Sequence, residues 1–477
     1  MRLLIVMQHV NFFRNLETVV RELDVRGHET VVLHGTRLEA AKAKAAAKGG
    51  ATASKMARLG RGIELADAEL GSLTTGYRPV PEERRQRMLR SGRQLVNRSI
   101  YLRPGHPSPE RVVDSLEKSL SPIVRTGLRA PGASLLLGNR RVLPAWRRIE
   151  RRGRASAELT SLIAGIAPDV VLVSPSIWPK NPVEADYIHA ARKLGIPTVG
   201  YLNSWDNLTS KGTVHVLPDV FIVWNEALAR EAEEIHLIPR EIIRVTGAPH
   251  LDHFFDMQAS RTRAEICRDL GCPDDRPYVV YLCSSRTLIA DETQIVTGLA
   301  DALAALLGDG APTVVVRPHP VNPDPWKSYG HPGTAVYPTQ GDQADTAESW
   351  QEYFDQLSEA GAFVGLNTTA FLEAAVADRP CMTIVSDEFF DQQGRTGHFR
   401  HLLAADFLEV SESVGDVAGR VARVLDGADE KAVGRRRFVR DFLRPRGTET
   451  PARAVVADTI EALAGPQRPR VAQEAVA

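Results

Sequence analysis

The feature that most constrains the fold is a regular alternation of short apolar runs with amphipathic segments of helical length. It begins at the N-terminus, where 3–7 and 29–33 have the pattern of strands on either side of a helix at 16–23. Such a strand–helix–strand unit predicts parallel pairing, with helices covering both faces of the sheet. The chain is therefore expected to be an α/β protein.

The same alternation returns after residue 160 and again after residue 250. The expected strands are 169–174, 197–202, 220–224 and 242–246, then 278–283, 313–316, 361–365 and 381–385. The expected helices are 182–194, 226–235, 261–270, 292–307 and 368–377, with one or two more between 431 and 463. A chain of 477 residues is too long for one ordinary core. We expect two Rossmann-like doubly wound domains, 1–250 and 251–425, followed by C-terminal helices and a tail at 426–477.

Residues 36–160 break the pattern, and we interpret them as a basic helical insertion in the first domain. Between Arg78 and Arg154 there are 19 Lys and Arg against six Asp and Glu. One interpretation is a set of solvated helices. The other is a surface for peripheral contact with an anionic membrane, or for a polyanionic or lipid-diphosphate acceptor.

Composition excludes several classes of protein. The formal net charge is zero, and few aromatic residues are interleaved with the basic segment, so no nucleic-acid partner is expected. The four cysteines show no paired metal-ligand spacing, and neither a metal site nor a disulfide framework is expected. No apolar run approaches the ~20 residues that span a bilayer. We expect a cytoplasmic protein, and the second interpretation of the insertion adds peripheral contact with the inner membrane face.

Polar groups follow several expected strands of the second domain. Arg317 and His319 lie in an RPHP turn, and Ser284, Ser285 and Arg286 follow the strand at 278–283. After the strand at 361–365, Thr368 and Thr369 open a helix that carries Glu373 one turn later. Hydroxyls and backbone N–H groups at a helix start suit an anion, and ligands of parallel sheets bind at the carboxyl ends of strands. Each residue also has an ordinary interpretation, as a turn residue, a helix cap or a surface carboxylate.

The first domain and one later loop offer groups for the other side of a crevice. His9, Asn11 and Arg14 follow the first strand, and the loop at 201–212 contains Asp206, Asn207 and Lys211. The loop at 388–401 contains Gln393 and His398. We expect these residues, apart from His9 and Asp206, to contact sugar or acceptor.

Four motifs together resemble the GT-B glycosyltransferase superfamily, in particular bacterial capsule and surface-polysaccharide glycosyltransferases and CDP-glycerol glycerophosphotransferases. They are VTGAP at 245–249, RPHP at 317–320, NTTAFLEA at 367–374 and FLRPRG at 442–447. The resemblance covers the second half well and the first half in outline. It implies that the second domain binds a nucleotide-activated donor, with His319, Thr368 and Thr369 at the phosphate and Glu373 at the ribose. It implies no metal and no cofactor other than this co-substrate.

The resemblance also implies an inverting transfer. Retaining enzymes of the large family carry a second glutamate eight positions before the first, where this chain has Gly365. The more distant UDP-GlcNAc 2-epimerases carry a paired Glu and a later acidic–Arg motif, both absent here. An inverting transfer needs a base at the acceptor hydroxyl, and Asp206, His9 and Glu184 are the candidates from the first domain.

The sequence thus predicts a glycosyltransferase that moves a sugar from a nucleotide donor to a cell-surface glycan or a lipid-linked acceptor. A glycerophosphotransferase of the same fold, using CDP-glycerol, is the first alternative. An inactive binding or scaffold protein with the same fold is the second.

Overall fold

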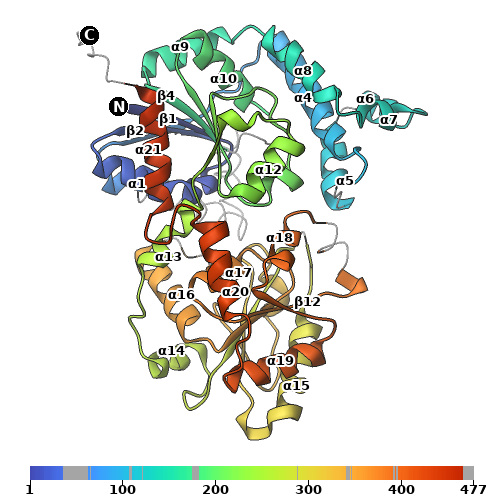
Figure 1. The fold of residues 1–477 in the computed structure, drawn as a ribbon, viewed down its shortest axis with the longest axis vertical. Helices are drawn as coiled ribbons and strands as arrows, with labels where there is room; N and C mark the ends of the chain where they lie inside the picture. The colour runs from blue at the N-terminus through green and yellow to red at the C-terminus, as the bar shows by residue number, and fades with distance from the viewer. Residues whose placement is uncertain are drawn as a thin grey trace.

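The computed structural model describes residues 1–35, 63–64, 66–106, 110–120, 122–174, 182–286, 288–339, 344, 346–389, 393 and 396–465. They form two α/β domains, each built on one parallel sheet and drawn one above the other in Figure 1. The expected fold class is therefore confirmed. Within the described part of the chain, no helix combines the length and apolarity that a membrane crossing requires.

The sheet of the first domain has seven strands in the order β3-β2-β1-β4-β5-β6-β7. The strands are β1 Arg2–Met7, β2 Glu29–His34, β3 Leu73–Tyr77, β4 Val170–Ser174, β5 Thr198–Tyr201, β6 Val220–Val223 and β7 Ile243–Val245. The strand order reverses between β1 and β4, which pair in parallel with Leu3 opposite Val170. This reversal is the topological switch point where ligands of doubly wound sheets bind.

The second sheet repeats the arrangement with six strands in the order β10-β9-β8-β11-β12-β13. They are β8 Val279–Leu282, β9 Val314–Arg317, β10 Thr334–Val336, β11 Ala362–Gly365, β12 Cys381–Ile384 and β13 Leu408–Ser411. Its switch point lies between β8 and β11. The central strands are continuous apolar runs because helices cover both faces of each sheet, and β1 from Leu3 to Met7 is wholly buried.

Helices occupy both faces of the two sheets (Figure 1). Those before residue 250 are α1 Glu17–Val25, α4 Arg84–Ile100, α5 Glu110–Ser119, α6 Pro122–Leu128, α7 Ala133–Leu137, α8 Val142–Arg151, α9 Ala157–Ile166, α10 Glu184–Lys193, α11 Asn207–Ser210 and α12 Glu226–Glu234. Those after it are α13 Asp252–Asp256, α14 Arg263–Leu270, α15 Thr293–Leu307, α16 Ala347–Glu359, α17 Ala370–Val376, α18 Phe399–Ala404, α19 Val414–Leu425, α20 Ala432–Phe438 and α21 Ala452–Ala464.

The chain crosses between the domains twice, and the two crossings pack on each other. Gly247 has φ +100°, and a Cβ there would lie 2.7 Å from the Leu443 carbonyl oxygen, so only glycine fits. Next to it, the buried Asp252 pairs with Arg444 at 2.9 Å. The VTGAP and FLRPRG motifs therefore meet at the linker. After this second crossing α21 returns to the first domain and lies beside α1, as Figure 1 shows.

The basic segment differs from our expectation in two ways. It contains β3, an edge strand of the first sheet, where we expected the alternation to be lost. Its arginines are also not uniformly solvated, because five are at most 9% exposed: Arg78, Arg90, Arg93, Arg103 and Arg147. Arg147, for example, donates to the carbonyls of Val214 at 2.8 Å and His236 at 2.6 Å. Much of the positive charge therefore ties α4 and α8 to the sheet domain.

Candidate functional site

The helix start after β11 forms the second-domain side of the candidate site. Gly365 lets β11 end close to β8, since a Cβ there would lie 2.7 Å from the Leu282 carbonyl oxygen. The chain then turns through Thr368, whose Oγ1 accepts from the Ala370 N–H at 3.3 Å, and the exposed Thr369. The same close approach leaves no room for a larger side chain at position 365.

Glu373 is held one turn into α17 by a residue that sequence reasoning did not identify. The Tyr353 hydroxyl on α16 donates to Glu373 Oε2 at 2.5 Å. Burial and the neighbouring Glu373 charge raise the pKa of Tyr353 well above its ordinary value, so it stays a hydrogen-bond donor. We had not predicted α16, although the Thr346–Ser349 capping box and the apolar spacing of its buried face mark a helix start.

Arg14 brings the first domain to the same carboxylate. It lies in the short helix Val10–Asn15 directly after β1, at the first switch point. Surrounding protein lowers the pKa of its guanidinium, and the Glu373 charge opposes that effect. Its side chain nevertheless remains accessible to solvent. A cation enclosed by both domains yet open to water marks a crevice at the carboxyl ends of both sheets.

The loop after β5 makes a second contact across this crevice. Trp205 Nε1 donates to Thr369 Oγ1 at 3.3 Å. The Trp205 ring also packs edge-on against His398, with ring centroids 4.8 Å apart. The structure thus brings the predicted residues Thr369 and His398 together with the loop that carries Asp206.

Asp206 is an ionised group in a hydrogen-bonded loop. Burial alone would raise its pKa, but the Lys211 and His398 charges and the Ser210 hydrogen bond outweigh burial and lower it. Ser210 Oγ donates at 2.6 Å, Asn207 Nδ2 donates at 3.0 Å, and Lys211 Nζ is 3.6 Å away. These partners make Asp206 a poor proton acceptor at neutral pH. Asn207 and Lys211 therefore contact Asp206 within this loop, and His398 faces the loop from the second domain.

Glu184, our third candidate base, is not placed for that role. It is 2% exposed, inside the first domain, with Arg78 Nη1 at 3.8 Å. Burial raises its pKa to about 7 although Arg78 opposes the shift. A carboxyl enclosed in this way cannot reach an acceptor hydroxyl in the described conformation. His9, in contrast, is half-buried at the end of β1, where it precedes the short helix that carries Asn11 and Arg14.

Three predicted site residues, two expected at the donor and Gln393 expected at the sugar or acceptor, contact other residues of the second domain instead. Ser284 is buried, and its N–H and Oγ donate to Glu292 at 2.7 and 3.1 Å. Arg317 stacks on the Tyr353 ring at 3.8 Å and so supports the partner of Glu373. Gln393 is wholly buried, and its amide donates to the Leu366 and Ile384 carbonyls. The sequence pattern located the loops correctly but not the direction of these side chains.

Other expected donor residues remain at the strand ends. Ser285 is half-buried and Arg286 exposed directly after β8. His319 is half-buried after β9, and its Nδ1 accepts from the Val321 N–H at 3.2 Å. An imidazole that accepts through Nδ1 carries its proton on Nε2 when neutral, and Nε2–H is a donor suited to an anionic oxygen. Within the described part of the chain, no three His, Cys, Asp or Glu side chains gather as metal ligands.

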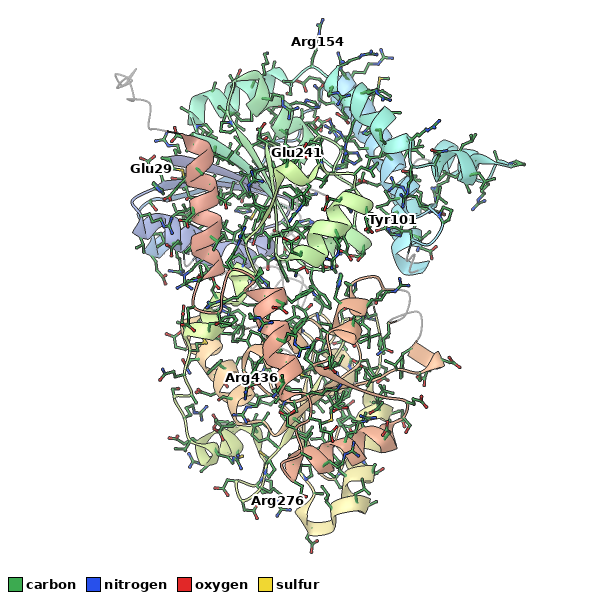
Figure 2. The ribbon with its side chains drawn as sticks, in the orientation of Figure 1. Glu29, Tyr101, Arg154, Glu241, Arg276 and Arg436 are labelled. Atoms are coloured by element: carbon green, nitrogen blue, oxygen red, sulfur yellow. The ribbon has the colours of Figure 1, made fainter. Side chains whose placement is uncertain are left out.

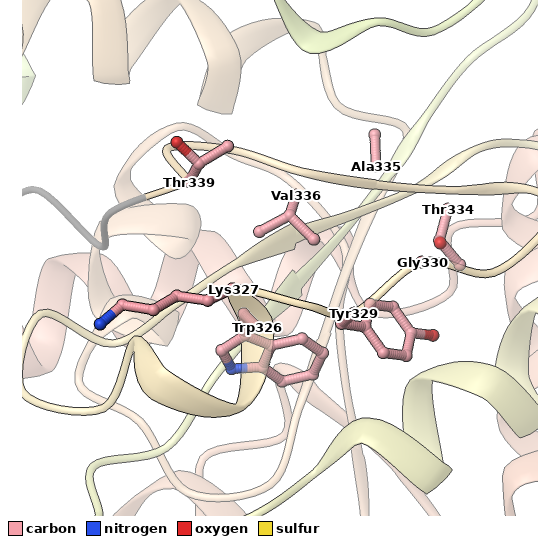
Figure 3. Close-up of a pocket in the computed structure, with 8 residues that line it drawn as sticks. All are labelled: Trp326, Lys327, Tyr329, Gly330, Thr334, Ala335, Val336 and Thr339. Carbon is pink, nitrogen blue, oxygen red and sulfur yellow. The ribbon is translucent and has the colours of Figure 1, made fainter.

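A separate groove of about 390 Å³ lies at the edge strand β10, as Figure 3 shows. Trp326 and Tyr329 line one side, and Thr334 and Val336 line the other. None of its lining residues belongs to the interdomain site.

Comparison with solved structures identifies the fold. The chain superposes on a protein of Listeria monocytogenes assigned as a UDP-N-acetylglucosamine 2-epimerase, with TM-score 0.54, 11% identity and 98% of each chain covered. It also superposes on a glycosyltransferase of Rickettsia africae, with TM-score 0.51, 9% identity, and 98% of this chain and 99% of the other covered. The UDP-GlcNAc 2-epimerase of Neisseria meningitidis bound to UDP-GlcNAc gives TM-score 0.51, 12% identity, and 97% and 100% coverage. No protein-family model and no curated protein sequence matches. The chain has the GT-B fold, as the motifs indicated.

Proposed function

We propose that this protein is an inverting transferase that moves a sugar from a nucleotide-activated donor to a glycan or lipid-linked acceptor, without a metal cofactor. The observation that carries the proposal is the contact between strand-end regions of the two domains. Trp205, after β5, donates to Thr369 at the start of α17, and the charge of Glu373 on the same helix acts on Arg14, which follows β1. Among proteins with the same fold, one is named as a glycosyltransferase and another is bound to UDP-GlcNAc. These names support a nucleotide sugar as the donor.

The donor would lie at the start of α17. Glu373, held by Tyr353, would accept the ribose hydroxyls, and the hydroxyls of Thr368 and Thr369 would contact the diphosphate. Arg14 supplies positive charge from the opposite domain, and Nε2–H of His319 is a further donor to the phosphate. Negative charge grows on this diphosphate as the sugar leaves, so donors and cations fixed in advance lower the barrier.

His9 is the better of the two remaining candidates for the base. It is half-buried just after β1, five residues before Arg14, and imidazole is the side chain most often used as a general base. Asp206 is ionised and hydrogen-bonded to Asn207 and Ser210, so we assign it to holding its own loop together. We therefore expect His9→Asn to lower kcat about 100-fold or more with little change in nucleotide affinity. Loss of nucleotide affinity with little change in kcat would contradict the assignment of His9 as the base.

A nucleotide screen by thermal shift tests the donor site. A ligand at 100 times its Kd stabilises by about 2.7 kcal/mol, which is easily seen in the melting temperature. We expect uridine or cytidine diphosphates to stabilise the protein, and Glu373→Ala to weaken that affinity about 10- to 100-fold, as the loss of a charged hydrogen bond implies. Glu412→Ala is the matched control, because Glu412 is an exposed carboxylate of the same domain. Absence of any stabilisation by pyrimidine nucleotides would contradict the proposal.

Product analysis separates transfer from the related chemistries. Incubation with UDP-GlcNAc and no acceptor should yield no epimerised sugar, because Glu373 has no paired glutamate beside it in the sequence. Parallel reactions with CDP-glycerol and with nucleotide sugars distinguish a glycerophosphotransferase from a glycosyltransferase. An inactive scaffold would give no product with any donor, and its nucleotide affinity would not change in the Glu373→Ala variant.

A further inference from the structure

A basic arm extends from the first domain on the side away from α1 and α21. It runs from α5 through α6 and α7 to Arg141, and Figure 1 shows α6 and α7 standing clear of the sheet. Between Glu117 and Glu150 the sequence contains seven Lys and Arg and no Asp or Glu. Unlike the buried arginines of α4 and α8, Arg129, Arg140 and Arg141 are exposed. Other arginines of the basic segment are exposed on α4 and α8, for example Arg84 and Arg148, so the arm carries part of the charge that faces solvent.

The end of the arm displays two large apolar side chains. Leu135 is 83% exposed and Leu136 is 76% exposed, on the short helix α7. This helix is held in place, because a Cβ at Gly138 would lie 2.5 Å from the Leu102 carbonyl oxygen and only glycine allows that approach. Neighbouring leucines exposed on an anchored helix are unusual on a soluble surface and mark a contact with another body.

We propose that the arm docks this protein on an anionic lipid bilayer, with Leu135 and Leu136 inserted at the headgroup boundary and the flanking arginines on the lipid phosphates. Apolar side chains surrounded by arginine, without a carboxylate in that stretch, match a surface that is negatively charged and apolar beneath its headgroups. The surface of an ordinary folded protein carries charges of both signs, so it does not require a partner surface of leucines flanked only by arginines. The proposal goes beyond the proposed function and stands on different residues.

The base of the arm is joined to the candidate site. Tyr101, at the end of α4 and labelled in Figure 2, donates from its hydroxyl to the Lys211 carbonyl at 2.6 Å. Asn97 Oδ1 accepts from the Thr213 N–H at 2.8 Å in the same loop. This is the loop that carries Asp206 and contacts Thr369. Docking through the arm would thus hold the loop that carries Asp206 at a fixed position relative to the bilayer.

Vesicle co-sedimentation of the full chain, without nucleotide, tests the proposal. We expect binding to vesicles of phosphatidylcholine mixed with phosphatidylglycerol, much weaker binding to phosphatidylcholine alone, and loss of binding as salt rises. Leu135→Ser combined with Leu136→Ser should reduce the partition coefficient at least about tenfold. The control is Val25→Ser with Val433→Ser, which removes residues 84% and 68% exposed on α1 and α20 and should change nothing.

A charge series tests the electrostatic part. Each arginine near an anionic surface contributes about a fivefold change in partitioning, so Arg129, Arg140 and Arg141 all changed to Gln should cost on the order of 100-fold. The matched control changes three exposed arginines of the second domain to Gln, namely Arg268, Arg423 and Arg437.

Three results would overturn the proposal. One is equal binding to charged and uncharged vesicles, and another is vesicle binding that the arm variants do not weaken. The third is a dimer, seen by sedimentation without vesicles, that the leucine variant dissociates, since the arm would then contact a second copy of the chain. Because no nucleotide is present, failure here leaves the nucleotide screen unaffected, and failure of that screen leaves this result standing.

Discussion

Arg93 is the residue at which a substitution should cost most among the buried arginines. Its Nε donates to Glu150 Oε1 at 2.7 Å, its Nη2 lies 2.9 Å from Asp186 Oδ1, and its Nη1 donates to the Pro182 carbonyl at 2.9 Å. The three charged side chains are at most 3% exposed. Arg93→Met would leave Glu150 with His189 and Asp186 with Arg90 at 3.7 Å. Removing the central cation from these buried pairs costs about 3 to 5 kcal/mol.

The pKa of Glu150 reports on the same cluster of buried charges. Burial alone would raise this pKa, but hydrogen bonds from His189 and Arg93 outweigh burial and hold it at about 2, against an ordinary 4.5. At 1.36 kcal/mol per pKa unit, the ionised carboxylate contributes about 3 kcal/mol to the free energy of unfolding. Because the pKa is lower in the folded state, this contribution is present above pH ~4.5 and is lost as the pH falls toward 2.

Urea unfolding at neutral and acid pH measures both effects. Arg93→Met should lower the free energy of unfolding by about 3 kcal/mol or more at pH 7, and it should reduce the loss of stability between pH ~4.5 and 2. Arg98→Met is the control on the same helix, because its pair with Glu117 is partly exposed, at 12% and 39%, and should be worth at most about 1 kcal/mol. If the two variants lose equal stability, the cluster is screened by water and the reasoning is wrong.

Three further predictions test the second domain and its contact with the first. Burial raises the pKa of Glu292 to about 7, as it does for Glu184, so each carboxyl should lower wild-type stability by about 3 kcal/mol as pH rises from ~4.5 to 7. Thermal melts of Glu292→Gln should show a pH slope smaller by the Glu292 share. Gly434→Ala places a Cβ 1.9 Å from the Asp406 carbonyl oxygen and should cost at least about 2 kcal/mol in urea unfolding. Trp205→Ala removes the contacts with Thr369 and His398, so small-angle scattering should show a larger radius of gyration without nucleotide.

Each of these has an outcome that would contradict it. An unchanged pH slope in Glu292→Gln would mean that another group titrates there. Gly419→Ala is the control for the glycine, since its Cβ would meet nothing within 4 Å, and equal stability of the two variants would contradict the steric argument. A radius of gyration equal to wild type in Trp205→Ala would show that other contacts hold the domains together.

The alternation of apolar and amphipathic segments determined most of the fold. The strands at β1, β8 and β11 lie within one residue of their expected limits, because a strand buried on both faces must be apolar throughout. The strands we did not predict are β3, β10 and β13, and the edge strand β10, Thr334–Val336, is only half-buried. A strand with one partner and an accessible face carries no continuous apolar run, so periodicity does not identify it.

The site was determined by sequence only in part. The strand–Thr–Thr–helix pattern located Thr369 and Glu373, and the first βα turn located Arg14, because short-range order places such residues at strand ends. Arg14 comes from the first domain, and Thr369 and Glu373 come from the second. They lie near one another only because of the way in which the two domains pack. Tyr353, which holds Glu373, comes from a helix with no site motif of its own.

The direction of each polar side chain was decided by tertiary structure. Ser284 and Gln393 have the composition of ligand-binding residues, yet both are buried against hydrogen-bonding partners within the second domain. The arginines of the basic segment show the same limit, since Arg93 lies inside an ion-pair cluster and Arg140 faces solvent. A sequence specifies charge and spacing, whereas burial depends on which distant carboxylates and carbonyls the fold brings within reach.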